Sequence, residues 1–351
     1  MRVALAAVGV VLIAATAGGA AGAPRAEAAP SIVELAWSPN GKWLAYLVQG
    51  SVEGPHSLYV VRADRAVQRR VVHTTHQLMG IAWAPDSKKL AVRDYGRSCV
   101  TWISAANGRD ARQTEGCFED WSPDSRRFVL YGEADRSLYV VDSRSGESRF
   151  LVQDAEDPVS GEARWSPNGA RIAFARFASG IGFRIFSIGA NGSDLRQESA
   201  DPTERANQIV VGWSRDSTKL AYFEYHGITD FVSKAFVVAA DGSRRSTQIS
   251  DSPRWLFWSP GGRRLAVLER PHGTFGARIV TPGGATVSTL ADVVEIAWRP
   301  NGASVVFRGV RPWEGWGVYT ARADGKGATR RVGPGHLHCR TAQTCELIAP
   351  P

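Results

Sequence analysis

A short motif built around tryptophan returns seven times along this chain and constrains its fold more than any other feature. The first copy reads Trp-Ser-Pro-Asn-Gly from Trp37 to Gly41. The seven tryptophans lie 46, 38, 44, 48, 45 and 40 residues apart, and they are Trp37, Trp83, Trp121, Trp165, Trp213, Trp258 and Trp298. This spacing is close to the roughly 40 to 45 residues of a four-stranded propeller blade. The repeat therefore predicts seven blades.

Each repeat has the residue order of a β-meander. The motif places Pro, then Asn or Asp, then a small residue, as a tight turn requires. The runs beside it, such as Val33–Ala36 and Leu90–Val92, are too short for stable helices and have strand character. A third run such as Leu58–Val61 follows, and an Asp-Gly or Asn-Gly turn signal often leads into a fourth. We expect an all-β, seven-bladed β-propeller of four-stranded antiparallel meanders, with the repeated tryptophans packed between blades.

These repeats carry a resemblance to a known family. The Trp-Ser-Pro-Asp-Gly turn, the strand after it and the later Asp-Gly turn resemble the WD40-like repeats of TolB-like β-propellers, over about residues 32–333. The chain departs from the family pattern where Arg215 replaces Pro, where Gly261 replaces Asp, and where serine replaces glycine at Ser87, Ser125 and Ser217. The resemblance implies the fold and favours protein binding, although a propeller by itself does not define a function.

The first residues have the pattern of a secretory signal peptide. Arg2 gives a positive start, Val3–Ala17 is an uncharged apolar run, and Ala26-Glu27-Ala28 supplies a small-x-small cleavage site. We expect a signal peptide at residues 1–28, and an exported protein that is periplasmic, associated with the cell envelope or secreted. An uncleaved anchor is the alternative, since Val3–Ala23 contains 21 uncharged residues. Residues 29–351 are expected to be a single domain with no further membrane segment.

Four cysteines form an even set, which favours disulfides in an exported chain. Cys99 starts the third strand of the second repeat and Cys117 follows the fourth, so a meander brings both to one end of neighbouring strands. We therefore pair Cys99 with Cys117, and Cys339 with Cys345 in the C-terminal tail. The tail also contains His336-Leu337-His338-Cys339, but this spacing matches no zinc pattern. We predict no metal site and no cofactor.

The formal net charge is +8, which could attract anionic partners. The basic residues are spread over all repeats, and no run of five or six like charges resembles a nucleic-acid-binding arm. We therefore expect no nucleic-acid partner, and we expect a monomer.

The two ends of the strands differ in character. We call the end that carries the Trp-Ser-Pro turns the turn end. The opposite end, with the connections from second to third strand and from blade to blade, is the variable end, and its loops differ in length and composition. Aromatic and charged residues in three of these loops form the predicted binding surface: Tyr225, His226, His272, Phe275, Arg311, Trp313 and Trp316. The alternative role of Trp316 is simple packing at the start of its strand.

Signatures of catalysis are sparse in this sequence. It has no Gly-x-Ser-x-Gly elbow, no phosphate loop and no His-Glu-x-x-His motif. We expect a non-catalytic recognition or scaffold propeller that binds a protein, a peptide or an envelope polysaccharide. The alternative is a metal-dependent polysaccharide lyase, similar to the propeller-fold oligogalacturonate lyases. For that activity His56, His73, His76, His226 and His272 would have to converge at the variable end.

Overall fold

The computed structural model describes twelve ranges of the chain, and everything said below of the structure refers to them. These ranges are 31–50, 54–65, 68–152, 159–178, 182–201, 206–226, 232–270, 275–311, 315–327, 329–333, 336–341 and 344–348. They contain thirty β-strands and no helix. Accordingly, the described ranges hold no helix that could cross a membrane.

The described residues pack into two compact units. Unit 1 holds the first three meanders, apart from short parts of β11 and β12, and unit 2 holds the last four and the C-terminal hairpin. The strands of blades one to three are β1 (Ser31–Trp37), β2 (Trp43–Gln49), β3 (His56–Arg62), β4 (Gln68–Thr74), β5 (Gln77–Trp83), β6 (Lys89–Tyr95), β7 (Cys99–Ala105), β8 (Arg112–Glu115), β9 (Cys117–Trp121), β10 (Arg127–Gly132), β11 (Ser137–Asp142) and β12 (Ser148–Val152).

The strands of blades four to seven are β13 (Arg164–Trp165), β14 (Arg171–Ala178), β15 (Gly182–Gly189), β16 (Arg196–Gln197), β17 (Asn207–Trp213), β18 (Lys219–His226), β19 (Val232–Ala239), β20 (Ser246–Ser250), β21 (Pro253–Trp258), β22 (Leu265–Glu269), β23 (Gly276–Val280), β24 (Thr286–Ala291), β25 (Val293–Trp298), β26 (Ser304–Arg311), β27 (Gly315–Arg322) and β28 (Arg330–Gly333). The tail adds β29 (His336–Thr341) and β30 (Thr344–Ile348).

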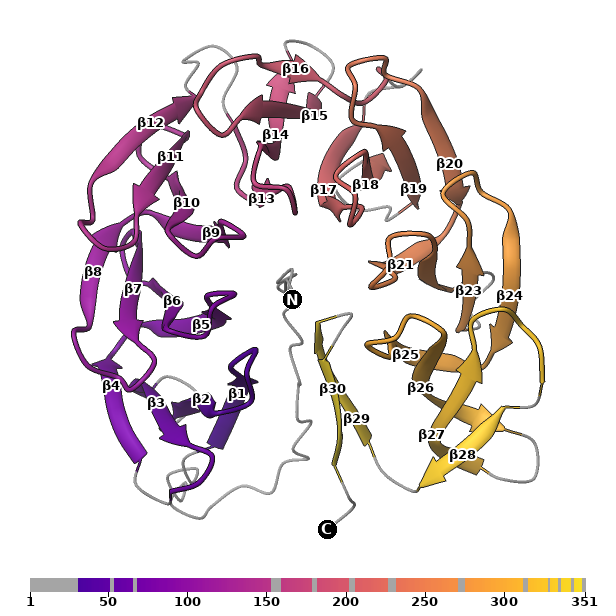
Figure 1. Cartoon of the computed structure of the whole chain (residues 1–351), viewed down its shortest axis with the longest axis horizontal. Coiled ribbons are helices and arrows are strands. Elements are labelled where there is room, and N and C mark those ends of the chain that lie inside the picture. Colours follow the sequence, from indigo (N-terminus) through magenta and orange to yellow (C-terminus); the bar gives the residue numbers. More distant parts are fainter. Residues whose placement is uncertain are drawn as a thin grey trace, which may run out of the picture. The chain divides into compact units, whose positions relative to one another are not determined.

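Seven four-stranded antiparallel sheets follow one another along the chain (Figure 1). Each sheet takes four consecutive strands, as in the order β5-β6-β7-β8, and the tail forms a separate hairpin of β29 and β30. No described strand joins a sheet made by a distant part of the chain. The predicted fold class, a β-propeller of seven four-stranded meanders, is confirmed. The single domain expected over residues 29–351 stays a prediction.

The repeated turn is held by its own side chains. In the first copy the Ser38 hydroxyl donates to Asn40 Oδ1 at 2.8 Å and accepts from the Trp43 backbone N–H at 3.0 Å, while Asn40 Oδ1 also accepts from the Lys42 N–H at 3.0 Å. The backbone N–H of Gly41 closes the turn onto the Ser38 carbonyl at 2.8 Å, with Gly41 at a φ of 69°. The Ser-Pro-Asn-Gly order therefore satisfies the turn locally, which explains why it recurs.

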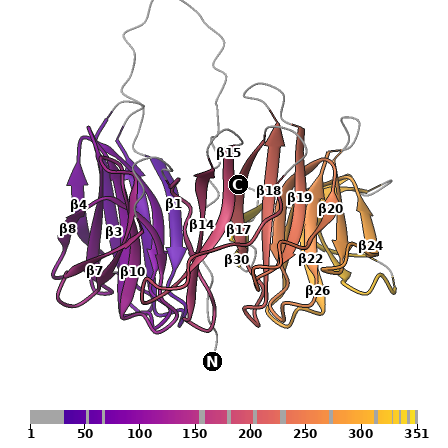
Figure 2. The same cartoon turned by 90° about the horizontal axis from the view of Figure 1, so that it is seen from above.

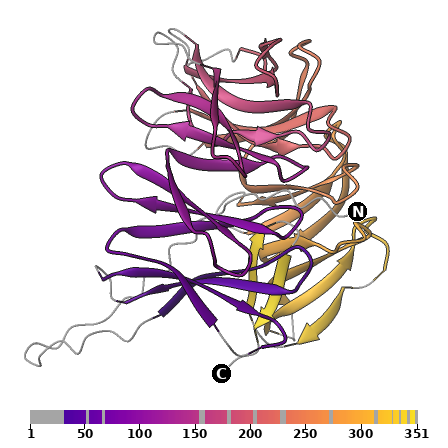
Figure 3. The same ribbon diagram turned by 60° about the vertical axis from the view of Figure 1, so that its left-hand side comes forward.

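Serine in place of glycine ties one turn to the turn before it. Ser87, Ser125 and Ser217 keep the positive φ of the glycines, at 64°, 63° and 61°. The hydroxyl of Ser87 accepts from the Asn40 N–H at 3.0 Å, and that of Ser125 accepts from the Asp86 N–H at 2.9 Å. Figure 3 shows the stacked meanders that these contacts join in unit 1, coloured indigo to magenta. The serines that stand in place of glycine at Ser87 and Ser125 therefore form contacts between neighbouring blades.

The repeated tryptophans join neighbouring blades by one recurring hydrogen bond. In five of the seven repeats the indole N–H donates to the carbonyl of the residue that precedes the tryptophan of the previous blade. Trp121 donates to Ala82 at 3.0 Å and Trp298 to Phe257 at 3.1 Å. Further examples are Trp83 to Ala36, Trp213 to Arg164 and Trp258 to Gly212. The core role predicted for these residues is therefore seen in both units.

Trp37 is the exception and corrects the expectation that all seven tryptophans are buried. It is 41% exposed, whereas Trp298 is 2% exposed. Trp258 is partly buried.

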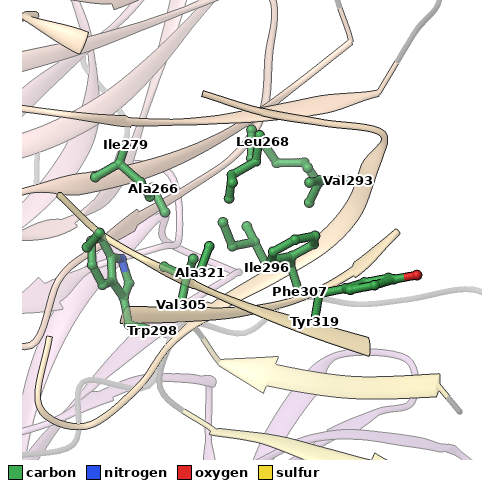
Figure 4. Close-up of a cluster of buried hydrophobic side chains, with 13 residues drawn as sticks. Ala266, Leu268, Ile279, Val293, Ile296, Trp298, Val305, Phe307, Tyr319 and Ala321 are labelled. Atoms are coloured by element: carbon green, nitrogen blue, oxygen red, sulfur yellow. The ribbon is translucent and has the colours of Figure 1, made fainter. Parts of the chain in front are cut away.

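Blades six and seven share an apolar core (Figure 4). Ala266 and Ile279 come from blade six, and Trp298, Phe307 and Tyr319 come from blade seven. The rings of Phe307 and Tyr319 stack with centroids 5.6 Å apart. This packing supports the loops at the variable end of both blades.

The Cys99–Cys117 disulfide is confirmed. Cys99 begins β7 of blade two and Cys117 begins β9 of blade three, so the bond links two neighbouring blades. Cys339 and Cys345 are directly paired residues of β29 and β30, and their disulfide stays a prediction.

Candidate functional site

The variable end of blade six contains a pocket of about 300 Å³. β22 ends there, β23 begins there, and the last residues of β24 complete the wall (Figure 2 labels β22 and β24). The lining residues are Glu269, Phe275, Gly276, Ala277, Arg278, Thr289, Leu290, Ala291 and Asp292. Carbon atoms form most of this wall. The pocket therefore suits an apolar side chain or the face of a sugar ring.

An ion pair stabilises the base of the pocket. Arg278 donates from Nη2 to Glu269 Oε1 at 2.6 Å and from Nε to Oε2 at 2.8 Å, and Ser250 donates to Oε1 at 2.5 Å. A further bond from Arg278 Nη2 reaches the Ile249 carbonyl of blade five at 2.8 Å. These bonds to Glu269 raise the pKa of Arg278 above its usual range. The pair fixes the pocket wall and locks blade six to blade five.

Phe275 lies at the rim of the pocket with a cation over its ring. The Arg270 guanidinium is 4.9 Å from the ring centroid, which is a cation–π contact. Phe275 is half-buried, so part of the ring stays accessible. The rim therefore offers an aromatic surface held in place by its neighbour.

The opposite part of the rim is the connection from blade six to blade seven. Asp292 has a φ of 54°, and its carbonyl accepts from the Val310 N–H at 3.1 Å. A Cβ on Gly309 would lie 2.2 Å from that carbonyl oxygen, so only glycine permits the approach. The Asp292 residue is exposed, which adds a negative charge to the pocket rim.

Trp316 presents a second aromatic surface on blade seven. It is 58% exposed, and the Arg308 guanidinium lies 5.5 Å from its ring centroid. Arg308 is held by Glu295, to which it donates from Nη2 at 2.8 Å and from Nε at 3.1 Å. This carboxylate, guanidinium and indole arrangement fixes a flat surface of a kind that is frequent at binding interfaces.

Tyr225 is half-buried near the end of β18. Burial raises the pKa of its phenol well above the usual range, and the negative charge of Glu162 raises it further. The phenol therefore remains protonated at neutral pH and keeps its O–H donor.

The structure describes the side chains of three of the seven residues in the predicted surface, Tyr225, Phe275 and Trp316. Phe275 lines the pocket, whereas Tyr225 and Trp316 are not among its lining residues. His226 and Arg311 are the last residues of β18 and β26, as expected for the variable end, and their side chains lie outside the described part.

His272 and Trp313 lie outside the described residues altogether. The grouping of all seven residues into one surface stays a prediction.

Sequence reasoning missed Glu269 and Arg278. The sequence did contain a pattern that points to Glu269. In three repeats an acidic residue stands eleven positions after the tryptophan, and these residues are Asp94, Glu224 and Glu269. All three are buried and hydrogen-bonded. Glu224 accepts from Gln208 Nε2 at 2.9 Å, and Asp94 accepts from Trp102 Nε1 at 3.1 Å.

Two of the histidines named for the lyase alternative have other partners in the described part. His76 Nδ1 lies 2.9 Å from Asp94 Oδ1, and His73 Nδ1 lies 2.8 Å from the Ser57 hydroxyl. Within the described ranges, no three His, Cys, Asp or Glu side chains form a group able to hold a metal ion. This search for metal-binding groups does not cover His226 and His272, because their side chains lie outside the described part.

Comparison with known proteins supports the fold. No protein-family model matches the chain, and no curated protein matches it. Among solved structures, prolyl oligopeptidase B from Galerina marginata bound to a 35mer substrate is similar with a TM-score of 0.57 at 10% identity, over 91% of this chain and 51% of that one. A structure of prolyl endopeptidases gives 0.57 at 12% identity, over 88% of this chain and 51% of that one.

TolB from Acinetobacter baumannii gives a TM-score of 0.45 at 15% identity, over 70% of this chain and 62% of that one. This chain thus spans about half the length of the peptidases and less than two thirds of this TolB. At these identities the similarity to the peptidases concerns the fold alone.

Proposed function

We propose that this chain is a non-catalytic recognition or scaffold propeller that binds a protein, a peptide or an envelope glycan at the variable end of blades five to seven. The observation that carries the proposal is the pocket at that end, with the half-buried Phe275 at its rim. A rigid wall limits the conformational entropy that binding must overcome.

The Glu269–Arg278 pair at the pocket supports a structural role for Glu269 over a catalytic one. Both oxygens of Glu269 already accept hydrogen bonds from Arg278, and Oε1 also accepts from Ser250. A general acid or base needs a proton that it can exchange with the substrate. Glu269 therefore serves as a structural carboxylate that keeps the wall in place.

A role outside the cytoplasm is part of the same proposal. The Cys99–Cys117 disulfide supports it, because disulfides persist mainly in oxidising compartments. The signal-peptide pattern before residue 29 points the same way.

The test begins with arrays of peptides and envelope glycan fragments, followed by titration of the best binder. Phe275→Ala and Trp316→Ala should each weaken that binder by about tenfold or more if they are hot spots, and leave the melting temperature nearly unchanged. Lys88→Ala, at the turn end, is the matched surface control and should bind normally. A binder that loses affinity with Lys88→Ala and ignores both aromatic variants would place the site elsewhere.

A further inference from the structure

A second surface of unit 2 carries unpaired positive charge. The connections between first and second strand of blades five, six and seven, here called the inner turns, hold a group of cations. This cationic strip consists of Arg215, Lys219, Arg263, Arg264 and Arg299. None of them forms an ion pair with any described residue. Arg215, Arg263 and Arg299 are exposed.

Lys89 and Arg171 stand at the position of Lys219 in blades two and four, and both have structural partners. Lys89 donates from Nζ to the Ser143 carbonyl at 2.7 Å and to its hydroxyl at 2.8 Å. Arg171 pairs with Asp194 at 2.7 Å. At the outer turn between third and fourth strand of blade seven, Arg322 Nε donates to Asp324 at 3.0 Å. The cationic strip therefore has no comparable role in holding the fold.

The three inner turns lie against one another. A Cβ on Gly262 would lie 2.8 Å from the backbone nitrogen of Arg215, and one on Gly302 would lie 3.6 Å from Pro260 Cδ. The turns are equivalent parts of successive meanders, so their cations lie on neighbouring turns at one end of the strands. Asp216 is the acid within these turns. It accepts from the Ser214 and Thr218 hydroxyls at 2.6 and 2.8 Å, and its carboxylate offsets one of the five positive charges.

The inner turns offer charge without a stacking surface. The large apolar residues exposed on the described parts of blades five to seven are Trp255, Trp316 and Val332, and each lies outside the inner turns. Recognition of a single-stranded base usually adds an aromatic platform to positive charge. A layer of guanidinium groups alone suits a broad anionic surface.

We propose that the turn end of blades five to seven docks on an anionic lipid surface through the cationic strip. Each Lys or Arg near such a surface strengthens binding by about fivefold at moderate ionic strength. Docking by the turn end leaves the variable end, at the other ends of the same strands, free for a partner. This inference does not depend on the proposed function.

Sedimentation with lipid vesicles tests the docking. The wild-type protein should bind vesicles of phosphatidylcholine with added phosphatidylglycerol at low salt, and should release when salt shortens the screening length. It should not bind vesicles of phosphatidylcholine alone. The triple variant Arg215→Gln, Arg263→Gln and Arg299→Gln should lose about a hundredfold in partitioning.

A control variant with three substitutions removes the same amount of positive charge from the variable ends of the blades. Arg97, Arg136 and Arg254 are exposed, and Arg97→Gln, Arg136→Gln and Arg254→Gln together should bind within about threefold of wild type if position matters more than net charge. An equal loss in both triples would overturn the docking surface, as would unchanged binding by the inner-turn triple. Binding to soluble heparin without binding to the charged vesicles would assign the strip to a polyanionic glycan and also refute the proposal.

Amide hydrogen exchange of the wild-type protein provides a readout that needs no variant. Charged vesicles should slow exchange in the inner turns around residues 215–218, 260–263 and 299–303. Protection confined to variable-end loops would reject the assigned orientation.

Discussion

At the residue scale, the fourth position of the repeated turn decides whether neighbouring turns can be tied together. Ser217 fills this position in blade five and accepts from the Asn168 N–H at 3.1 Å despite a φ of 61°. Gly262 and Gly302 fill it in blades six and seven, at φ values of 72° and 66°. The surroundings of these two glycines differ, so substitution by serine should destabilise the protein much more at one position than at the other.

Gly302→Ser should be tolerated and Gly262→Ser should not. A Cβ on Gly302 would lie 3.8 Å from the Gly261 nitrogen, so a serine hydroxyl could accept that N–H and offset the cost of a positive φ. A Cβ on Gly262 would lie 2.8 Å from the Arg215 nitrogen, and backbone must move. We expect Gly302→Ser to change the free energy of unfolding by less than about 1 kcal/mol and Gly262→Ser to cost about 2 to 3 kcal/mol. Urea denaturation measures both, and equal costs would contradict the proposed contact.

His56 should make stability depend on pH. Burial lowers the pKa of this imidazole below its usual 6.5, although the negative charge of Asp94 opposes the shift. The unfolded chain then binds more protons than the native chain below pH 6.5, so the free energy of unfolding should fall as the pH drops through this range. His56→Gln should flatten the slope between pH 7.5 and 5.5 in thermal melts. An unchanged slope would show that other groups dominate.

At the scale of the element, the tryptophan that ends each first strand fastens one blade to the next. Trp298 is buried and bonds to the Phe257 carbonyl, whereas Trp37 is 41% exposed. Trp298→Ala should therefore cost about 3 to 5 kcal/mol of unfolding free energy, and Trp37→Ala distinctly less. Chemical denaturation measures the difference. Equal costs would mean that Trp37 is buried in solution.

The strands, the turns between them and the disulfide were the features that the sequence predicted best. The order Ser-Pro-Asn-Gly forms its turn through bonds among Ser38, Asn40 and Gly41, all within a few residues. Cys99 and Cys117 could be paired because they are 18 residues apart and a meander brings them to the same end of neighbouring strands. Local chemistry of this kind is visible in a linear sequence.

At the scale of the whole molecule, the competing functions differ in their need for a metal. A metal-dependent lyase requires a bound divalent ion, whereas a recognition propeller does not. We expect purified protein to contain only substoichiometric manganese, zinc or calcium by elemental analysis, and chelation to leave its melting temperature unchanged. One tightly bound ion per chain would favour the lyase alternative.

The sequence by itself determined the seven meanders, the turns between their strands and the Cys99–Cys117 disulfide. Each depends on residues close together in the chain, repeated in phase, so a periodic pattern suffices to predict it.

Only the tertiary structure decided which residues meet across blades. Glu269 and Arg278 of blade six join Ser250 and the Ile249 carbonyl of blade five, and the pocket beside Phe275 rests on that contact. The sequence also could not show which cations remain unpaired at the inner turns. Lys89 and Lys219 occupy the same position in the repeat and differ only in their neighbours. Such contacts depend on side-chain directions and on the stagger between sheets, and no local pattern records them.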